Sequence, residues 1–135
     1  MLDTAAQLPR RSYDDDIGLD LFTSYEAVIP GNGFKGVPCG IAVELPPLTW
    51  GLLLGRSSTA TGWGLFVLPG VLDPGYRGEL SAMIYNLRGQ TQTIPIGTKI
   101  AQLIITLHPG PVDVERVAEL GESSRGVRGF GSTGA

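Results

Sequence analysis

The carboxylate of Asp73 stands in the densest polar stretch of the chain, from Gly70 to Glu79, and a carboxylate can activate a water molecule. Pro74-Gly75 follows it directly and predicts a tight turn. The turn presents Asp73 and Tyr76 from its two sides. A base for an attacking water would then lie beside an aromatic wall for a sugar. The alternative is a structural turn that carries both side chains incidentally.

A second candidate is the run Gly55-Arg56-Ser57-Ser58, which follows a strand-like segment and begins the one plausible short helix, Ser57 to Thr61. An arginine fork beside hydroxyls and free backbone amides is suited to receive a phosphate. Alternatively, Ser57 or Ser58 is only the N-cap of that helix.

Two further polar groups interrupt apolar strands. Asp20 lies between two leucines, where a buried carboxylate needs a cation, a metal or a neighbouring turn as its partner. Gln102 lies between Ile100 and Ile104, and its amide needs a phosphate oxygen or a backbone group. Lys99 could add charge there, although a solvated lysine is the commoner outcome.

The last eleven residues, Arg125 to Ala135, contain a phosphate-loop spacing from Gly126 to Thr133, with Ser132 where such loops carry lysine. Only two residues follow Thr133, so we expect no helix after the loop. The segment could close over a phosphorylated ligand held elsewhere. A disordered tail is the alternative.

Composition limits the possible partners. The 135 residues predict one domain, and the net charge of -3 with a pI of about 5.0 argues against nucleic acid as a partner. A polyanionic ligand would then need a local basic cluster and a divalent cation. Cys39 and His108 are each the one residue of their type, which argues against a disulfide or a zinc site. With no signal peptide or membrane-spanning run, we expect a cytoplasmic protein without membrane contact.

The apolar residues occur in short runs between turns, which predicts an all-β barrel or jelly-roll-like sandwich. No segment has a sustained helical period, apart from the short helix at Ser57 to Thr61. The strands are expected at 19–22, 27–29, 41–45, 50–54, 80–85 and 100–107, the last covered on both faces.

Five segments, in this order, resemble the five motifs of the trimeric dUTP pyrophosphatases (dUTPases): 17–21, 55–58, 70–79, 97–104 and 125–134. The resemblance covers nearly the whole chain. It implies a jelly-roll-like distorted β-barrel over residues 1–124, in a homotrimer. A flexible glycine-rich tail, residues 125–135, would cross to a neighbouring subunit and close over its active site.

The activity that the resemblance implies is hydrolysis of dUTP to dUMP and pyrophosphate, assisted by Mg²⁺, with water attacking the α-phosphorus in line. Asp73 would orient and deprotonate the water, and Asp20 would hold water in the outer shell of the metal. Tyr76 would pack on the deoxyribose and refuse a 2′-hydroxyl. The further residues implied to contact the nucleotide are Arg56, Ser57, Ser58, Gly70 and Gln102, and in the tail Arg125 (γ-phosphate), Phe130 (uracil), Ser132 and Thr133 (phosphates).

The chain departs from the family pattern at three places. Ile17 replaces the usual alanine of the first motif, and Arg128 adds a charge to the fifth. The segment from Gly64 to Leu72 is about two residues shorter than the family's base-reading hairpin and lacks its polar residue. The strictness for uracil is therefore less determined than the triphosphate chemistry.

Two rival functions share this scaffold. A dCTP deaminase-like enzyme resembles the chain at Arg56-Ser57-Ser58 and at Asp73-Pro74-Gly75, but it needs a proton-shuttling glutamate three residues before Asn86, where this chain has Met83. A regulatory nucleotide-binding protein is the other rival. Such a protein would be expected to lose a residue of the catalytic type or to gain an insertion, and this chain does neither.

Overall fold

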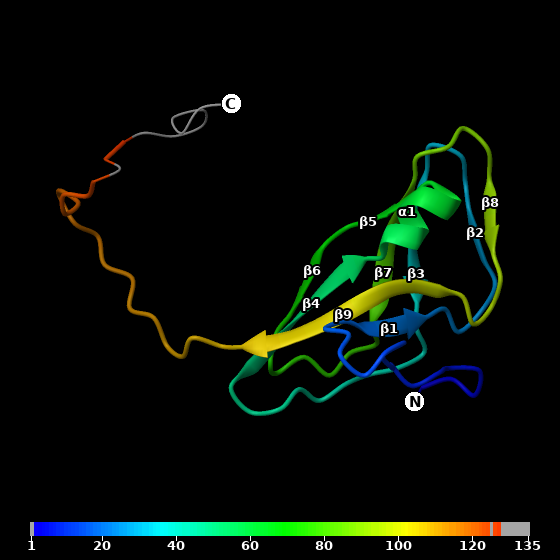
Figure 1. Cartoon of the computed structure of the whole chain (residues 1–135), viewed down its shortest axis with the longest axis horizontal. Helices are drawn as coiled ribbons and strands as arrows, with labels where there is room; N and C mark the ends of the chain where they lie inside the picture. Colours follow the sequence, from blue (N-terminus) through cyan, green and yellow to red (C-terminus); the bar gives the residue numbers. More distant parts are fainter. Residues whose placement is uncertain (1, 125, 128–135) are drawn as a thin grey trace.

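Short strands dominate the computed structural model, which describes residues 2–124, 126 and 127 (Figure 1). The one helix described has seven residues, and no described helix is long and apolar enough to cross a membrane. In chain order the elements are β1 (Leu19–Phe22), β2 (Ala27–Ile29), β3 (Phe34–Pro38), β4 (Thr49–Gly55), α1 (Ser57–Trp63), β5 (Leu65–Val67), β6 (Gly70–Leu72), β7 (Ser81–Asn86), β8 (Gln92–Ile94) and β9 (Lys99–Leu107).

Three antiparallel sheets form the body. The largest has the strand order β1-β9-β4-β6, the second β3-β7-β5, and the third consists of β2 and β8. Most paired strands are far apart in sequence, so the chain crosses repeatedly between sheets, as jelly-roll architectures do. The prediction of an all-β, jelly-roll-like fold is confirmed.

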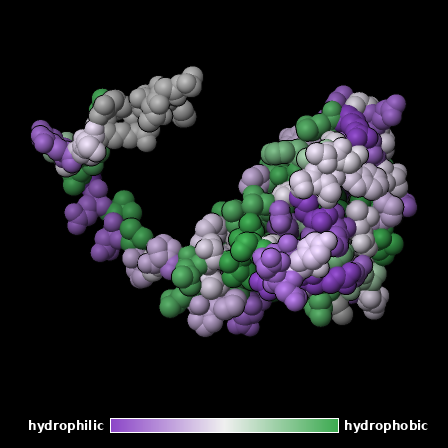
Figure 2. Space-filling model, viewed as in Figure 1, coloured by the Kyte–Doolittle hydropathy of each residue, from purple (hydrophilic) through white to green (hydrophobic). Residues whose placement is uncertain are grey.

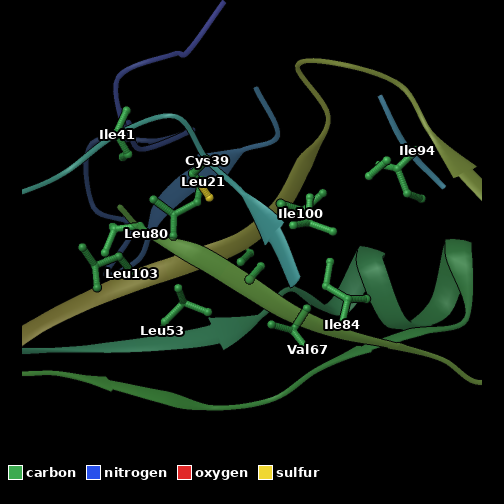
Figure 3. Packing of buried hydrophobic residues seen from close by; sticks show 14 of the residues in the cluster. Leu21, Cys39, Ile41, Leu53, Val67, Leu80, Ile84, Ile94, Ile100 and Leu103 are labelled. Atoms are coloured by element: carbon green, nitrogen blue, oxygen red, sulfur yellow. The ribbon is translucent and has the colours of Figure 1, made fainter. Parts of the chain in front are cut away.

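The core lies between the sheets. In β7 the side chains alternate between exposed and buried, so that Ala82 and Ile84 enter the interior. Leu53 from β4 and Leu103 from β9 approach from the largest sheet (Figure 3). Burial of each such leucine or isoleucine side chain stabilises the fold by about 1.5–3 kcal/mol.

The strand expected at 41–45 is wrong. Ile41 and Leu45 are buried and Glu44 is exposed, so the side chains alternate as expected, but the backbone forms no strand ladder there. The carbonyl of Ile41 accepts one hydrogen bond from Leu80 N (2.8 Å), and Pro46-Pro47 ends the extended run. Alternation of apolar and polar residues predicts which side chains are buried, but a β-strand also needs a neighbouring strand to pair with.

Four strands, β3, β5, β6 and β8, were not among those expected, and β3 and β8 have the weakest local signals. β3 contains Gly36 and ends at Pro38, and both residue types are rare in strands. β8 has only three residues. Pairing with β7 and β2, respectively, fixes these segments, because tertiary contacts override weak local preference.

Beyond β9 the chain leaves the body and runs outward (Figure 1). Residues 111–124 are exposed throughout, including Val114 and Leu120. The last residues of β9, Thr106 and Leu107, are exposed as well, so this strand is not covered on both faces along its whole length within the described chain. The proposed boundary between residues 124 and 125 stays a prediction.

Candidate active site

Asp20 is the centre of a charged cluster at the edge of the largest sheet. Its side chain comes from β1 and has only 8% of its surface exposed. Oδ1 lies 2.7 Å from Arg56 Nε. Oδ2 lies 2.8 Å from Lys99 Nζ and accepts a hydrogen bond from Ser12 Oγ at 2.9 Å. The buried carboxylate therefore has two cations and a hydroxyl as partners.

These partners determine the charge state of Asp20. Burial alone would raise its pKa, but the hydrogen bonds from Lys99 and Ser12 and the charges of Arg56 and Lys99 outweigh it, so the pKa lies below its usual value. The group is thus a carboxylate at neutral pH. The prediction that Lys99 is merely solvated is wrong, because its ammonium group is paired.

Arg56 stands at the junction of β4 and α1 and is the N-cap residue of the helix. Its backbone is extended and its side chain makes no capping bond, so neither Ser57 nor Ser58 is the N-cap. That structural alternative is wrong. Besides its contact with Asp20, Arg56 donates from Nη1 to Ser58 Oγ at 3.1 Å. The guanidinium is therefore held on two sides, with a quarter of its side chain exposed.

Gln102 lies on β9 opposite Asp20 of β1. Its Nε2 donates to the Gly55 carbonyl at 3.0 Å, so a backbone group is the partner of this amide. Gly18 passes so close to the Gln102 side chain that an added Cβ would clash with its amide oxygen. Gly18 therefore allows Gln102 to stand beside Asp20.

Asp20, Arg56 and Gln102 line an open pocket with a volume of about 370 Å³, which we call the polar pocket. Hydrophilic side chains gather on this face, over β1 and the adjoining part of β9 (Figure 2). The lining residues are Ser12, Tyr13, Asp16, Ile17, Gly18, Asp20, Arg56, Ser57, Gln102 and Ile104.

Asp73 belongs to a different cavity, of about 260 Å³, which we call the apolar pocket. Tyr76 N donates to the Asp73 carbonyl at 3.0 Å, which confirms the predicted turn. Tyr76 Oη donates to the Glu79 carbonyl at 3.0 Å and holds the ring at the pocket wall. The lining residues are Leu53, Gly70, Val71, Leu72, Asp73, Tyr76, Glu79, Leu80, Ser81 and Leu103.

Arg77 braces this turn from outside. Its Nη1 donates to the carbonyls of Pro74 and Tyr76, both at 2.9 Å, and its Nη2 lies 3.1 Å from Glu44 Oε1. The Asp73 carboxylate, by contrast, is exposed and receives no hydrogen bond or ion pair from residues 2–124, 126 or 127.

The segment before this turn contributes one strand to each of two sheets. β5 pairs with β7 and β6 pairs with β4, so the two strands belong to different sheets. Pro69 has no N–H group, and Leu68 N donates to the Met83 carbonyl at 2.8 Å.

The two pockets lie on opposite faces of β9. Leu103 lines the apolar pocket, whereas its neighbours Gln102 and Ile104 line the polar pocket. Successive side chains of a strand point to opposite faces of the sheet. A ligand in the polar pocket of one chain is thus separated by the sheet from Asp73 of the same chain.

The structure therefore divides the predicted site residues into two groups. Asp20, Arg56, Ser57 and Gln102 line the polar pocket, with Ser58 bound to Arg56. Gly70, Asp73 and Tyr76 line the apolar pocket. The predicted tail residues Arg125, Phe130, Ser132 and Thr133 lie outside the described residues.

Sequence reasoning missed Ser12 altogether. It lies eight positions before Asp20, in a loop whose backbone amides at Ser12 and Tyr13 bind Asp16 Oδ2 at 3.2 and 3.0 Å. A bridge between Arg10 and Asp20 docks this loop on β1. No local sequence pattern predicts the contact between Ser12 and Asp20. The available signal in the sequence was that a buried carboxylate at Asp20 needs partners.

Among the described residues, no group of three or more His, Cys, Asp and Glu side chains could hold a metal ion. Magnesium, however, usually keeps several waters and binds one or two carboxylates together with substrate phosphates. Both oxygens of Asp20 already have partners, so a contact through water suits this carboxylate better than direct ligation. The residues present fit Mg²⁺ that arrives with a phosphate ligand.

Comparison with known proteins gives a consistent result. A family model described as dUTPase matches residues 4–134. The chain is 40% identical to a deoxyuridine 5'-triphosphate nucleotidohydrolase of Paramecium bursaria Chlorella virus 1, covering 96% of this chain and 92% of that one. It is 41% identical to the protein of the same name in Gloeothece citriformis, covering 98% and 92%.

Solved structures agree with these relatives. A mutant dUTPase of Staphylococcus bacteriophage 80alpha with dUpNHpp superposes with a TM-score of 0.92 and 26% identity, covering 99% of this chain and 95% of that one. A mutant dUTPase of phage phi11 of S. aureus, described with a structural Mg(II) ion, gives a TM-score of 0.80 and 26% identity, covering 87% and 94%.

Proposed function

This chain belongs to the dUTPase family, and from that premise we propose that it hydrolyses dUTP to dUMP and pyrophosphate. The observation that carries the proposal is the polar pocket, where Arg56, Gln102 and the paired Asp20 stand together. An arginine fork, an amide and hydroxyl groups are groups that bind phosphate oxygens.

The triphosphate lies in the polar pocket, contacted by Arg56, Gln102 and the hydroxyls of Ser57 and Ser58. Arg56 Nε remains with Asp20 while other N–H groups of the fork turn to phosphate. Positioning and charge stabilisation of this kind are most of what phosphoryl transfer needs.

Asp73 supplies the base. It accepts a proton from a water whose oxygen bonds to the α-phosphorus, while the bond from that phosphorus to the oxygen bridging to the β-phosphate breaks. Pyrophosphate leaves with the electron pair of that bond. The exposed carboxylate of Asp73, with no partner among the described residues, is free to take this proton.

Because the two pockets lie on opposite faces of β9, the complete site needs Asp73 from a second copy of the chain. We therefore propose a homotrimer in which the polar pocket of one subunit meets the turn at Gly70, Asp73 and Tyr76 of its neighbour. Tyr76 packs on the deoxyribose. Arg125, Phe130, Ser132 and Thr133 of a crossing tail cover the nucleotide and exclude water.

Mg²⁺, when bound with the triphosphate, neutralises negative charge on the phosphate oxygens. Asp20, whose two oxygens already have protein partners, would hold the ion through its water shell.

Deamination of dCTP is not supported. The position that would need a proton-shuttling glutamate is Met83, whose thioether lies on the exposed side of β7 and carries no exchangeable proton.

The test has two stages. The first measures pyrophosphate release from dUTP and from the four common deoxynucleoside triphosphates, with Mg²⁺ and with a chelator. We expect dUTP to be the preferred substrate and the chelator to suppress turnover. Equal or greater turnover of another nucleotide would reject the proposed substrate.

The second stage mixes two inactive variants, Asp73→Asn and Arg56→Ala, after unfolding and joint refolding. In a shared site, random assembly combines an intact Arg56 with an intact Asp73 in roughly a quarter of the sites. A mixture as inactive as its two components would reject the shared site. Cooperative thermal unfolding of each separate variant is the control for folding.

A further inference from the structure

Ser12 and Lys99 contact the same oxygen of Asp20, on the side away from Arg56. Lys99 Nζ lies 2.8 Å from Asp20 Oδ2 and donates to Ser12 Oγ at 2.7 Å, and Ser12 Oγ donates to the same Oδ2 at 2.9 Å. Three groups thus form a closed triangle. The other oxygen, Oδ1, is left to Arg56 Nε at 2.7 Å.

The triangle is built from three separate segments. Asp20 is on β1, Lys99 begins β9 with its Cα opposite Phe22, and Ser12 is in the loop closed by Asp16. Contacts between such distant segments are set by the fold and restrict rotation of the carboxylate.

Lys99 stands behind Asp20. Asp20, Arg56 and Ser12 line the polar pocket, whereas Lys99 is not among the described residues that line it. A cation that bound the ligand directly would be expected in that lining. Lys99 is placed to act on Asp20.

We propose that Ser12 and Lys99 are positioning residues, which fix the Asp20 carboxylate and thereby hold the Arg56 guanidinium ready to receive a phosphate. This inference rests on the proposed function of the polar pocket. With Oδ2 held by two donors, Oδ1 points at Arg56 Nε, and the fork keeps one orientation before the ligand arrives. Preorganisation of this kind improves affinity, because less side-chain freedom is lost on binding.

Replacement of Lys99 by Met keeps the length of the side chain and removes its charge. The fork then loses its fixed support, and we expect the Kd of α,β-imido-dUTP in Mg²⁺-free buffer, measured by calorimetry, to rise about tenfold, as for the loss of one good charged contact. KM for dUTP should rise in parallel while kcat changes less than about threefold. Lys99→Arg, which retains the charge, should recover most of the affinity.

A double-mutant cycle separates positioning from direct contact. If Lys99 acts through Asp20, Lys99→Met has no further effect on Kd in an Asp20→Asn background. The same tenfold loss in both backgrounds would mean that Lys99 binds phosphate itself, and would overturn the inference.

Ser12→Ala provides a second variant, in an exposed loop where the change removes only the hydroxyl. We expect a rise in Kd of about threefold that also disappears in the Asp20→Asn background. An unchanged Kd would remove Ser12 from the role. If the wild-type chain neither binds the analogue nor hydrolyses dUTP, the proposed function itself fails; a functional wild type with an additive cycle rejects only the positioning role.

Discussion

The two pockets of this chain are built in opposite ways. In the polar pocket Asp20 and Arg56 are already paired, and Gln102 is bound to the Gly55 carbonyl. In the apolar pocket the Asp73 carboxylate is exposed and receives no hydrogen bond from the described residues. In the polar pocket the polar side chains hold one another in place, whereas in the apolar pocket the carboxylate has no partner among the described residues.

The difference follows from the chemistry proposed for each pocket. A group that binds phosphate gains from being held in advance, because the cost of ordering is met during folding. A general base must exchange a proton with water, and a carboxylate already paired with cations is a weaker base. In the proposed trimer, the orientation of Asp73 depends on the neighbouring subunit, whereas that of Asp20 depends on its own chain.

The largest expected effect comes from Asp73→Asn. The amide is nearly isosteric with the carboxylate but cannot accept the proton, so we expect kcat for dUTP to fall about a thousandfold, within the range for loss of a general base. The affinity for α,β-imido-dUTP should stay within about threefold, because the phosphates are proposed to lie in the polar pocket. Pyrophosphate release and calorimetry measure the two quantities.

Asp113→Asn is the matched control for that change, because Asp113 is an exposed carboxylate in the segment outside the body. Its kcat should equal that of the wild type. Normal turnover in the Asp73→Asn variant would contradict the proposed difference between the pockets, because the apolar pocket would then not supply the general base.

A smaller effect is expected from Tyr76→Ala, which empties one wall of the apolar pocket. The ring is proposed to exclude a 2′-hydroxyl, so the ratio of kcat/KM for UTP to that for dUTP should rise about tenfold. Tyr76→Phe removes only the hydrogen bond to the Glu79 carbonyl and serves as the control. An unaltered ratio in the alanine variant would place sugar discrimination elsewhere.

The smallest effect concerns stability of the polar pocket. The folded pKa of Asp20 is lowered, so its charge stabilises the fold above the unfolded pKa, near 3.8, and this contribution is lost as the pH falls through the lower folded value. Asp20→Asn should therefore lower the free energy of unfolding by about 1–2 kcal/mol at pH 7, and the difference should shrink below about pH 4. Urea unfolding at pH 7 and pH 3 measures both.

For Asp113→Asn the folded environment adds no comparable contacts, and the free energy of unfolding should stay close to that of the wild type at both pH values. A gap for Asp20→Asn that did not narrow in acid would mean that the contacts of Asp20 stabilise the fold independently of its charge.

The sequence predicted the architecture where burial alone decides it. The alternation in 80–85 and the apolar run of β9 correctly predicted strands. Both patterns reflect which side chains are buried, and this does not depend on which strand is the pairing partner. The same rule failed at 41–45, where side chains alternate but no strand is available to pair. It also missed β3, β5, β6 and β8, which are short or contain glycine or proline and are defined by pairing with β7, β4 and β2.

The site residues were predicted in the same uneven way. Asp20 and Gln102 were detectable as polar residues at apolar positions, and Asp73 through its turn. Ser12 and the pairing of Lys99 were not, since both depend on a loop folding back onto β1. The division of the site residues between two pockets could not be predicted from local sequence either. It depends on which face of the sheet each side chain of β9 occupies.

The alternation of side chains along β9 limits the insertions and deletions that this strand can tolerate. A single inserted residue before Gln102 would rotate every later side chain of the strand by half a turn, aiming an amide at the interior and a leucine at the charged face. Because β9 is hydrogen-bonded to both β1 and β4, neither flank can slide to absorb the error. Natural length variation should therefore be confined to the connections, and a one-residue insertion in β9 should abolish both nucleotide binding and folding together.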